Sequence, residues 1–527
     1  MPLEVRPKAW APPSGSYNAA VDMVDRNVRE GRGGRPAFID PRRRLTYAEL
    51  MQRCDRFANA LPRLGIAREQ RIVMIMLDTV DFPSVFWGAI KAGVVPVPLN
   101  TLLPAETWRF MIEDSRAEAV VISPELLERA APALEEVARR RHLHVVVAGD
   151  TPPTGRIGLE QLLASSEPKA AAADTDADEV AFWLYSSGST GQPKGTRHLH
   201  ASPAHTAKWF AGDVLNFTEN EVVFSAAKLF FAYGLGNGMS FPMYFGATTV
   251  LLPDRPTPEA VLAIMRAQQP TIFCAVPTLL AAMLSGQGLG RGAGSERLRL
   301  STSAGEALPA EIGQRWQEVV GSEVIDGIGS TEMLHVFVTN RPGAVRYGSS
   351  GTPVPGYEAR VVDENSQDVK RGDIGELIIK GPSAAEGYWL QREKSRRTFR
   401  GEWTYTGDKY RVGEDGYYYY CGRTDDMFKV SGIWVSPFEV ESALITHSAV
   451  QEAAVIGKED SDGLIKPKAF VILKPGIAPD AKLFDELKEH VKTVAGPWKY
   501  PRWVEARPEL PKTATGKIQR FKLRAEG

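Results

Sequence analysis

The chain has 527 residues, which is too long for one ordinary domain and long enough for a large core plus an appended domain. Its 63 basic and 64 acidic residues nearly cancel, which excludes a general attraction to nucleic acid or to an anionic membrane. Cys54, Cys274 and Cys421 form no Cys-x-x-Cys pair, so a disulfide framework and a zinc site of that pattern are excluded and a reducing cytosol is favoured. Neither an apolar signal core nor a stretch of about 18 apolar residues occurs, so we expect a cytoplasmic protein without a membrane span.

The first segment alternates helix and strand signals. Thr46 and Glu49 form a capping box, which predicts the start of a helix. The apolar residues that follow at helical spacing are Leu50, Cys54, Ala58 and Leu61. The other elements expected here are a helix from 82 to 93 and strands at 71–77, 94–97, 119–122 and 143–147. Strand, helix and strand in this order make a βαβ unit.

A small, polar, proline-bearing stretch at 165–178 predicts a linker, and a second alternating segment follows it. Thr257 and Pro258 predict the start of a helix there. The other elements expected in this segment are a helix at 309–320 and strands at 182–185, 222–226, 248–252, 271–275 and 298–301. Short strands and glycine-containing turns follow between 345 and 420.

The last hundred residues change pattern again. Helices are expected at 437–446 and 483–493, and strands at 450–456 and 469–473. We therefore expect an α/β protein with a large N-terminal domain (1–424) of two layered α/β subdomains plus a small β subdomain. A small mobile α+β C-terminal domain (425–527) follows.

The strongest chemical signal is YSSGSTGQPKG at 185–195, directly after a predicted strand. Its glycines let the backbone approach an anion, and its hydroxyls, amides and Lys194 can bind phosphate oxygens. It is no Walker loop, because Gly195 rather than Ser or Thr follows the lysine. A flexible linker is the alternative, but a linker needs neither a fixed lysine nor a preceding strand.

Four further patterns follow in order: SAGEALP at 303–309, DGIGSTE at 326–332, the pair YTGD (405–408) and GR (422–423), and PKTATGKIQR at 511–520. Each alone has an ordinary structural explanation, such as a surface carboxylate or a common turn. Together they resemble the adenylate-forming superfamily of acyl-CoA ligases, luciferases and peptide-synthetase adenylation domains. The order and spacing over more than 300 residues make the resemblance specific.

The resemblance implies a role for each motif. It assigns Lys517 as the catalytic lysine on a C-terminal loop, Thr331 to the α-phosphate and Glu332 to Mg²⁺. Ile328 stands where the superfamily usually has an aromatic residue, which puts adenine stacking on that side in doubt. The residues assigned to ATP are Ser186, Ser187, Gly188, Ser189, Thr190, Gly191, Lys194, Ser303, Ala304, Gly305, Glu306, Asp326, Gly327, Ile328, Gly329, Ser330, Asp408 and Arg423.

The superfamily also implies a rotation of the C-terminal domain between two half-reactions. Asp425 falls at the position of the hinge, and Lys429 and Gly432 lie on the face that would then turn toward coenzyme A. The alternative for Asp425 and its acidic neighbour Asp426 is an ordinary turn.

Longer runs narrow the resemblance to the benzoate–CoA ligase family. They lie at 182–191, 225–237, 303–315, 327–335, 422–432 and 511–524. This implies ligation of an aromatic carboxylate to coenzyme A, with ATP and Mg²⁺, through an acyl-adenylate. The acyl pocket is then formed by Phe231, Ala232, Tyr233, Gly234 and His335. Small molecules are the expected partners, with neither nucleic acid nor membrane, and a homodimer is allowed.

Other interpretations remain at this point. The acyl group could be loaded onto a carrier protein instead of free coenzyme A, and an assay with free coenzyme A separates the two. A non-catalytic nucleotide-binding regulator is disfavoured because Lys194, Glu332, Asp408, Arg423 and Lys517 are all present. A luciferase-like oxygenase is disfavoured by the long runs. The FFAYG segment at 230–234 could also be plain core packing.

Overall fold

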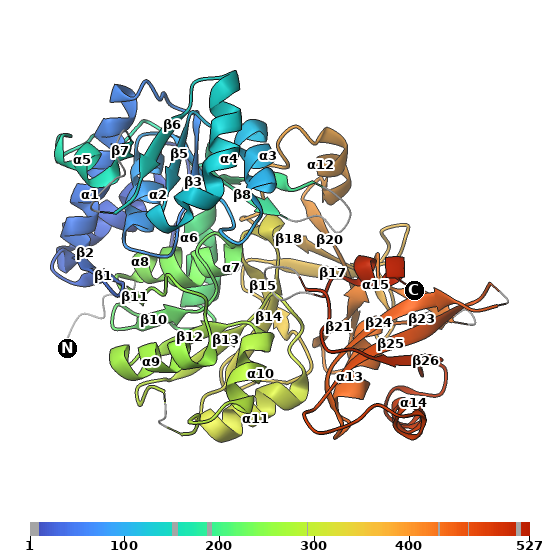
Figure 1. The fold of residues 1–527 in the computed structure, drawn as a ribbon. Coiled ribbons are helices and arrows are strands. Elements are labelled where there is room, and N and C mark those ends of the chain that lie inside the picture. The colour runs from blue at the N-terminus through green and yellow to red at the C-terminus, as the bar shows by residue number, and fades with distance from the viewer. Residues whose placement is uncertain are drawn as a thin grey trace.

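A computed structural model of the chain describes residues 10–149, 156–186, 192–291, 294–430, 433–461, 463–512 and 518–526. The larger part consists of two layered α/β halves that lie one above the other, and the C-terminal domain lies beside them (Figure 1). One hydrophobic cluster contains residues from both halves, for example Ile72 and Met243, so the two halves share a core.

The first half is a parallel sheet covered by helices on both faces. Its elements are α1 (Tyr47–Arg63), β3 (Arg71–Ile75), α2 (Asp81–Lys91), β4 (Val95–Pro98), α3 (Ala105–Asp114), β5 (Ala119–Ile122), α4 (Pro124–Arg140), β6 (His144–Val147), β7 (Ile157–Gly158) and α5 (Leu159–Ala164). The strand order is β4-β3-β5-β6-β7, and every pairing is parallel. Helices α1 and α2 pack on one face, whereas α3 and α4 pack on the other. Strands buried on both faces explain the apolar runs in the sequence.

Helix α1 shows how the sequence sets an element. The Thr46 side chain accepts a hydrogen bond from the Glu49 amide, and the Glu49 carboxylate accepts one from the Thr46 amide at 2.7 Å. The predicted capping box is therefore confirmed. Such caps contribute about 0.5–2 kcal/mol.

The predicted linker contains no helix or strand, yet side chains of α1 fix it in place. Asn59 donates to the carbonyls of Glu167 and Lys169 at 2.9 and 2.8 Å, and Arg56 donates to the carbonyl of Ser166 at 2.6 Å. These hydrogen bonds attach the segment that connects the two halves to helix α1 of the first half.

The second half is a mixed sheet. Its strands are β1 (Pro36–Ile39), β2 (Arg44–Thr46), β10 (Val222–Ser225), β11 (Thr248–Val250), β12 (Ile272–Ala275), β13 (Leu300–Ser303), β14 (Val324–Gly329), β15 (Val336–Thr339) and β16 (Thr352–Pro353). Its helical elements are η1 (Val21–Asp25), η2 (Val28–Arg32), α6 (Ser202–Thr206), η3 (Ala207–Gly212), α7 (Ala232–Leu235), η4 (Gly236–Ser240), α8 (Phe241–Phe245), α9 (Pro258–Gln268), α10 (Pro277–Ser285), α11 (Ala310–Val320) and η5 (Thr331–Met333). The order is β16-β15-β14-β13-β12-β10-β11-β1-β2, and the central strands from β11 to β14 are parallel. Helices α9, α10 and α11 cover one face.

A small β subdomain packs against the other face of this sheet. It contains β17 (Glu358–Val362), β18 (Gly375–Lys380), α12 (Arg392–Thr398), β19 (Phe399–Arg400), β20 (Trp403–Val412) and β21 (Tyr418–Arg423). Leu377 and Ile379 share a hydrophobic cluster with Phe337 and Val338, which joins the subdomain to β15. The predicted β subdomain is confirmed.

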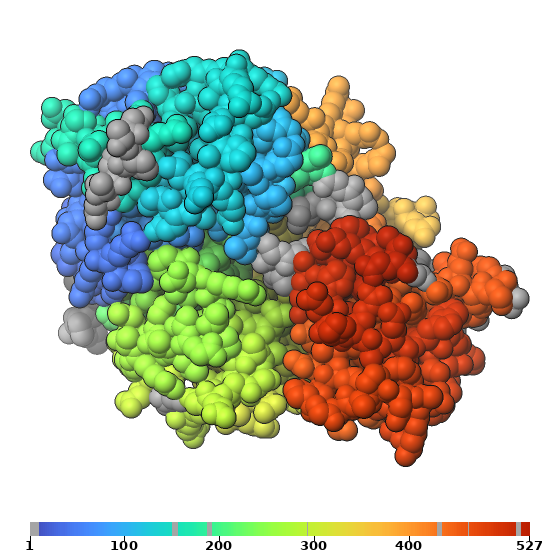
Figure 2. Space-filling model, in the orientation of Figure 1, coloured from blue at the N-terminus to red at the C-terminus, as the bar shows by residue number. Residues whose placement is uncertain are grey.

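The C-terminal domain forms a separate lobe at the lower right of the space-filling view (Figure 2). It contains β22 (Phe428–Val430), β23 (Ile433–Val435), α13 (Pro437–Ile445), β24 (Val450–Glu459), β25 (Ile465–Leu473), α14 (Ala481–Ala495), β26 (Trp503–Ala506) and α15 (Arg520–Glu526). Helices α13 and α14 share one cluster with the sheet β24-β25-β26, and Leu523 of α15 lies in a second cluster. The hairpin β22–β23, strand β26 and helix α15 were not among the predicted elements.

The other predicted strands and helices lie within about two residues of the observed ones, except that β24 ends three residues later and β25 begins four residues earlier than predicted. The α/β fold class is confirmed. Within the described residues, no helix combines the length and apolar character that a bilayer crossing requires.

Candidate functional site

A two-stranded hairpin presents the predicted phosphate-binding loop. It pairs β8 (Val180–Ser186) with β9 (Lys194–Leu199), so Ser186 and Lys194 lie opposite each other at its open end. The residues between them that were assigned to ATP (Ser187, Gly188, Ser189, Thr190 and Gly191) lie outside the described residues. Strand β9 was not predicted from the sequence. The hairpin nevertheless fixes both ends of the loop.

Aromatic residues anchor this hairpin to the first half of the molecule. The Tyr185 hydroxyl donates to the Asp114 carboxylate at 2.5 Å. The rings of Trp183 and Trp389 lie 4.8 Å apart, and the Trp389 indole donates to the Asp114 carbonyl at 2.9 Å. The loop therefore starts from a rigid base.

Glu332 lies at the open end of the hairpin, on the single turn η5. The Ser330 hydroxyl caps this turn by accepting from the Met333 amide at 3.2 Å, and the Ala385 amide donates to the Glu332 carbonyl at 2.8 Å. The Glu332 carboxylate accepts a hydrogen bond from the Ser186 hydroxyl at 3.3 Å. Thr331 lies on the same turn.

Lys194 and Tyr388 complete the surroundings of this carboxylate. The Tyr388 hydroxyl donates to Glu332 Oε1 at 2.7 Å, and Lys194 Nζ lies 3.9 Å from the same oxygen. Lys194 Nζ also lies 4.2 Å from the centre of the Tyr388 ring. Burial lowers the pKa of Lys194, whereas the negative charge of Glu332 acts in the opposite direction. A carboxylate, a lysine ammonium and two hydroxyl donors thus meet where the sequence predicted phosphate and metal contacts.

Two glycines of DGIGSTE let β15 approach β14 closely. A Cβ on Gly327 would lie 2.7 Å from the Val338 carbonyl oxygen, and one on Gly329 would lie 2.6 Å from the His335 carbonyl oxygen. Any larger residue would push β15, and with it η5, out of place. Ile328 between them pairs with Val338 and packs against the second cluster.

The predicted adenine segment adjoins this strand. Ser303 ends β13 and is the direct partner of Asp326 on β14, and both side chains are buried. Gly305 has a φ of 92°, a conformation that favours glycine. Burial raises the pKa of Asp326 well above its usual range. Ala304 is buried, and Glu306 follows Gly305 in the same turn.

The two residues that were assigned to the ribose lie close together. Asp408 and Arg423 are cross-strand partners on β20 and β21, and Arg423 Nη1 lies 3.1 Å from Asp408 Oδ1. The Arg423 guanidinium also donates to the Thr406 carbonyl at 2.9 Å, which leaves its orientation well defined. Burial is the main cause that lowers the pKa of Lys194, and the positive charge of Arg423 also contributes, so Arg423 lies within electrostatic reach of Lys194.

Of the predicted acyl residues, Tyr233 contacts His335, and two aromatic residues that were not predicted, Phe210 and Phe241, also surround it. Its Nε2 lies 3.3 Å from the Tyr233 carbonyl oxygen, and its ring centre lies 5.5, 4.5 and 5.1 Å from those of Tyr233, Phe241 and Phe210. Burial lowers the pKa of His335 to about 3, so the imidazole is neutral. The Tyr233 hydroxyl lies 2.7 Å from Thr302 Oγ1, next to Ser303, so one residue assigned to the acyl group lies beside the segment assigned to ATP.

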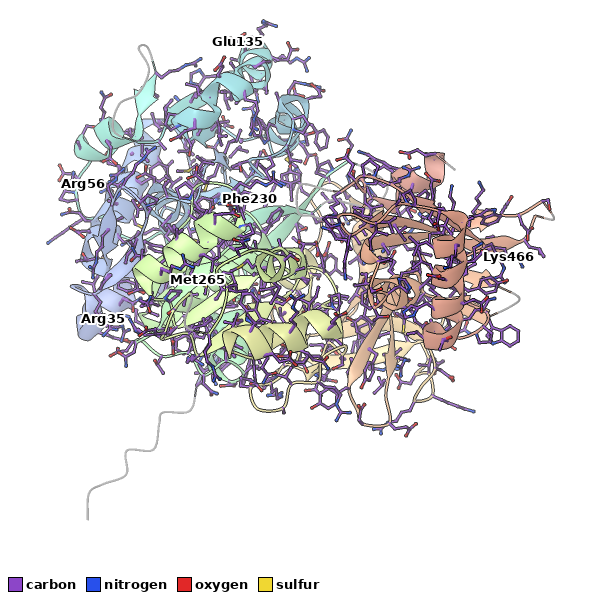
Figure 3. The ribbon with its side chains drawn as sticks, turned by 60° about the horizontal axis from the view of Figure 1, so that its bottom comes forward. Arg35, Arg56, Glu135, Phe230, Met265 and Lys466 are labelled. Carbon is purple, nitrogen blue, oxygen red and sulfur yellow. The ribbon has the colours of Figure 1, made fainter. Side chains whose placement is uncertain are left out.

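The segment that carries Phe231, Ala232 and Gly234 is tightly folded. A Cβ on Gly234 would lie 2.0 Å from the Lys228 carbonyl oxygen. Behind it, buried Asp78 accepts from the Leu229 amide at 3.3 Å and lies 3.9 Å from Lys228 Nζ. Burial raises the pKa of Asp78 to about 6, and Lys228 acts against that shift. The neighbouring Phe230 lies in the interior of the larger part of the molecule (Figure 3).

The predicted hinge lies in a turn between β21 and β22. The Asp425 carbonyl accepts from Arg524 at 3.4 Å, and the amides of Asp426 and Met427 donate to the Arg423 carbonyl at 3.0 Å. Lys429 lies on β22. Gly432 and the predicted catalytic Lys517 lie outside the described residues.

Both ends of the segment that contains Lys517 are nevertheless described. Lys512 and Ile518 form an isolated antiparallel bridge that closes its base. Just beyond, Arg520 Nη2 lies 2.7 Å from Glu441 Oε2, and Arg520 Nη1 lies 3.4 Å from Asp426 Oδ2. The base of the loop is therefore tied to the turn that contains the predicted hinge.

Sequence reasoning missed Tyr388, although it contacts two of the predicted residues. The sequence shows two adjacent aromatic residues in Gly-Tyr-Trp at 387–389. Nothing in the neighbouring sequence links this tripeptide to Glu332, which lies 56 positions earlier.

Comparisons with known proteins agree with this arrangement. The family described as AMP-binding enzyme matches residues 24–389, and the AMP-binding enzyme C-terminal domain matches residues 439–517. The chain is 55% identical to a 4-hydroxybenzoate–CoA/benzoate–CoA ligase of Rhodopseudomonas palustris, over 97% of this chain and 94% of that protein. It is 54% identical to a benzoate–CoA ligase of Thauera aromatica, over 97% and 96%.

Solved structures give the same result. A benzoate CoA ligase from Burkholderia xenovorans superimposes with a TM-score of 0.89 at 50% identity, over 96% of this chain and 100% of that chain. An anthranilate CoA ligase in complex with anthranoyl-AMP superimposes with a TM-score of 0.91 at 42% identity, over 97% of each chain.

Proposed function

The chain belongs to the AMP-binding enzyme family as an aryl carboxylate–CoA ligase, and on that premise we propose that its acid is benzoate or a close relative, activated as an aroyl-adenylate. The observation that carries the proposal is the aromatic cluster around the neutral His335 ring, which Tyr233 connects to Thr302 beside the segment assigned to ATP. We propose that these side chains line a pocket for a flat uncharged ring, because the described contacts of His335 and Tyr233 include no cation that could pair with a second carboxylate.

The first half-reaction joins two anions. A carboxylate oxygen attacks the α-phosphorus of ATP, the bond to the pyrophosphate oxygen breaks, and an acyl-phosphate anhydride results. The barrier is largely electrostatic, so the site must supply positive charge and donors along the phosphates. We propose that Lys194 and Ser186, which lie beside Glu332, donate to phosphate oxygens and that Thr331, on the same turn as Glu332, contacts the α-phosphate. Lys517 is proposed to neutralise the approaching carboxylate.

The residues around Glu332 fit a magnesium ion that is shared with the phosphates. A carboxylate oxygen is a ligand that Mg²⁺ prefers, and this cation usually combines one or two carboxylates with substrate phosphates. Within the described ranges, no cluster of three or more His, Cys, Asp or Glu side chains could hold a metal by itself. When bound, Mg²⁺ neutralises part of the phosphate charge.

The second half-reaction is thiolysis. The sulfur of coenzyme A attacks the acyl carbon, its proton is lost, and AMP leaves. We propose that the turn at Asp425 lets the C-terminal domain exchange its Lys517 loop for the β22–β23 face, with Lys429 and Gly432, between the two steps. The turn is short and lies between the end of β21 and the start of β22. Hinge residues are typically found at the ends of regular elements.

An Asp425→Pro substitution tests this hinge. Proline fixes its own φ near −65° and restricts Thr424 to an extended backbone. A turn that alternates between two backbone conformations would therefore retain only one of them. Aroyl-adenylate formation is expected to persist, while overall CoA ligation falls strongly. The two half-reactions are measured separately, as pyrophosphate release and as thioester formation from supplied aroyl-adenylate. Asp425→Ala, which leaves the backbone free, is the matched control. Unimpaired CoA ligation in the proline variant would remove the hinge role.

The substrate proposal is tested by pyrophosphate release with ATP, Mg²⁺, free coenzyme A and a panel of acids. Benzoate and small ring-substituted benzoates are expected to react, and acetate and butyrate to react much more slowly. Single methyl or methylene changes should alter kcat/KM by about 10–200-fold, because a hydrophobic pocket discriminates them by about 1–3 kcal/mol. Adenylate formation without thioester formation would instead favour a carrier-protein acceptor.

A further inference from the structure

We propose that Tyr388 is a positioning residue that holds the Glu332 carboxylate and the Lys194 ammonium in the arrangement that receives the magnesium-bound triphosphate. The proposal rests on the proposed function of the site. No motif identified in the sequence includes Tyr388, and its side chain is 4% exposed.

The first contact concerns Glu332. The Tyr388 hydroxyl donates a hydrogen bond to Glu332 Oε1 at 2.7 Å. The other described donor to this carboxylate is Ser186, at the longer distance of 3.3 Å. Hydrogen bonds to charged acceptors are among the stronger ones. The tyrosine therefore fixes the direction in which Glu332 presents its remaining lone pairs.

The second contact concerns Lys194. Its Nζ lies 4.2 Å from the centre of the Tyr388 ring, within the range of a cation–π interaction. It lies 3.9 Å from Glu332 Oε1, which is too far for a hydrogen bond. The ring face thus holds the ammonium beside the carboxylate without consuming its N–H donors. In the proposed complex, those donors bind phosphate oxygens.

The tyrosine is itself held from three sides. Its backbone pairs with Thr196 of β9, its amide donates to Ser395 Oγ at 2.9 Å, and its ring centre lies 5.5 Å from that of Phe399. The pairing with β9 is important because the same strand begins with Lys194. Tyr388 therefore fixes the position of the hairpin β8–β9 relative to the turn η5.

Two substitutions separate the contacts. Tyr388→Phe keeps the ring and removes the hydroxyl, and Tyr388→Leu removes both. Binding of a non-hydrolysable ATP analogue with Mg²⁺ is measured by titration calorimetry, beside binding of AMP without metal. Tyr388→Phe is expected to weaken the Mg²⁺–analogue complex about 10–100-fold, Tyr388→Leu by a further ~2–10-fold, and neither is expected to change AMP affinity.

Tyr417→Phe is the matched control. Tyr417 also donates through its hydroxyl, to the Ala344 carbonyl at 3.2 Å, and carries a cation, Arg346, 4.6 Å above its ring. It is expected to behave like the unmodified chain. In a Glu332→Gln background, the effect of Tyr388→Phe should shrink to within about twofold if the two residues act together.

Unchanged Mg²⁺–analogue affinity in Tyr388→Phe would overturn the proposal, and so would equal losses of AMP and Mg²⁺–analogue binding. These titrations use no acid and no coenzyme A. A chain that binds nucleotide as expected but ligates no aryl acid would refute the proposed substrate and leave the role of Tyr388 supported.

Discussion

Replacement of Lys517 by alanine is expected to lower the rate of aroyl-adenylate formation by about 10²–10³-fold and to leave thiolysis of supplied aroyl-adenylate nearly unchanged. The reason is that only the first step brings a carboxylate against a triphosphate, and a compact ammonium between them removes their mutual repulsion. The two rates are measured in single turnovers, as pyrophosphate release and as thioester formation.

Lys522→Ala is the control for this prediction, because it removes another cation from the same tail at an exposed position of α15. Lys517→Arg retains the charge but changes its shape, so a partial recovery is expected if geometry as well as charge matters. Equal loss of both half-reactions in Lys517→Ala would show that the lysine supports the folded site as a whole rather than the first step.

The resemblance to the superfamily predicted which motifs belong to one site, and the sheet topology shows that two of them follow neighbouring strands. Ser303 ends β13, and Glu332 follows β14, its parallel neighbour, so their proximity results from topology alone. Asp408 and Arg423 were predicted as a pair and lie opposite each other on β20 and β21. Motif order and the resemblance contain this information, whereas β14 was not among the predicted strands.

Tyr388 could not be predicted in the same way, since its contacts depend on how three separate segments pack. Its hydroxyl reaches Glu332 only because β9 pairs with residue 388 and the Ala385 amide binds the Glu332 carbonyl. The stretch at 165–178 has the composition of a loose linker, yet Asn59 and Arg56 of α1 fix it. Long polar side chains that bind backbone carbonyls leave no periodic signal.

Replacement of Arg520 by glutamine is expected to lower the stability of the C-terminal domain by about 3–5 kcal/mol, because it breaks a buried ion pair and leaves one charge without its partner. Glu441, whose side chain is 6% exposed, would keep only smaller partners such as the Val455 amide, which donates to it at 2.7 Å. The free energy of opening is measured by hydrogen exchange of the α13 and β24 amides.

Arg524→Gln is the control variant that shows how much of the stability loss depends on the burial of the ion pair. Arg524 lies on the same helix and pairs with the same Asp426, but its side chain is 36% exposed, so its loss should cost at most about 1 kcal/mol. Because Arg520 lies three residues beyond Lys517, its substitution should also slow aroyl-adenylate formation more than thiolysis. Equal stabilities of the two variants would mean that the Arg520–Glu441 pair is not a structural anchor. The loop that carries Lys517 would then have to be positioned by the bridge between Lys512 and Ile518 alone.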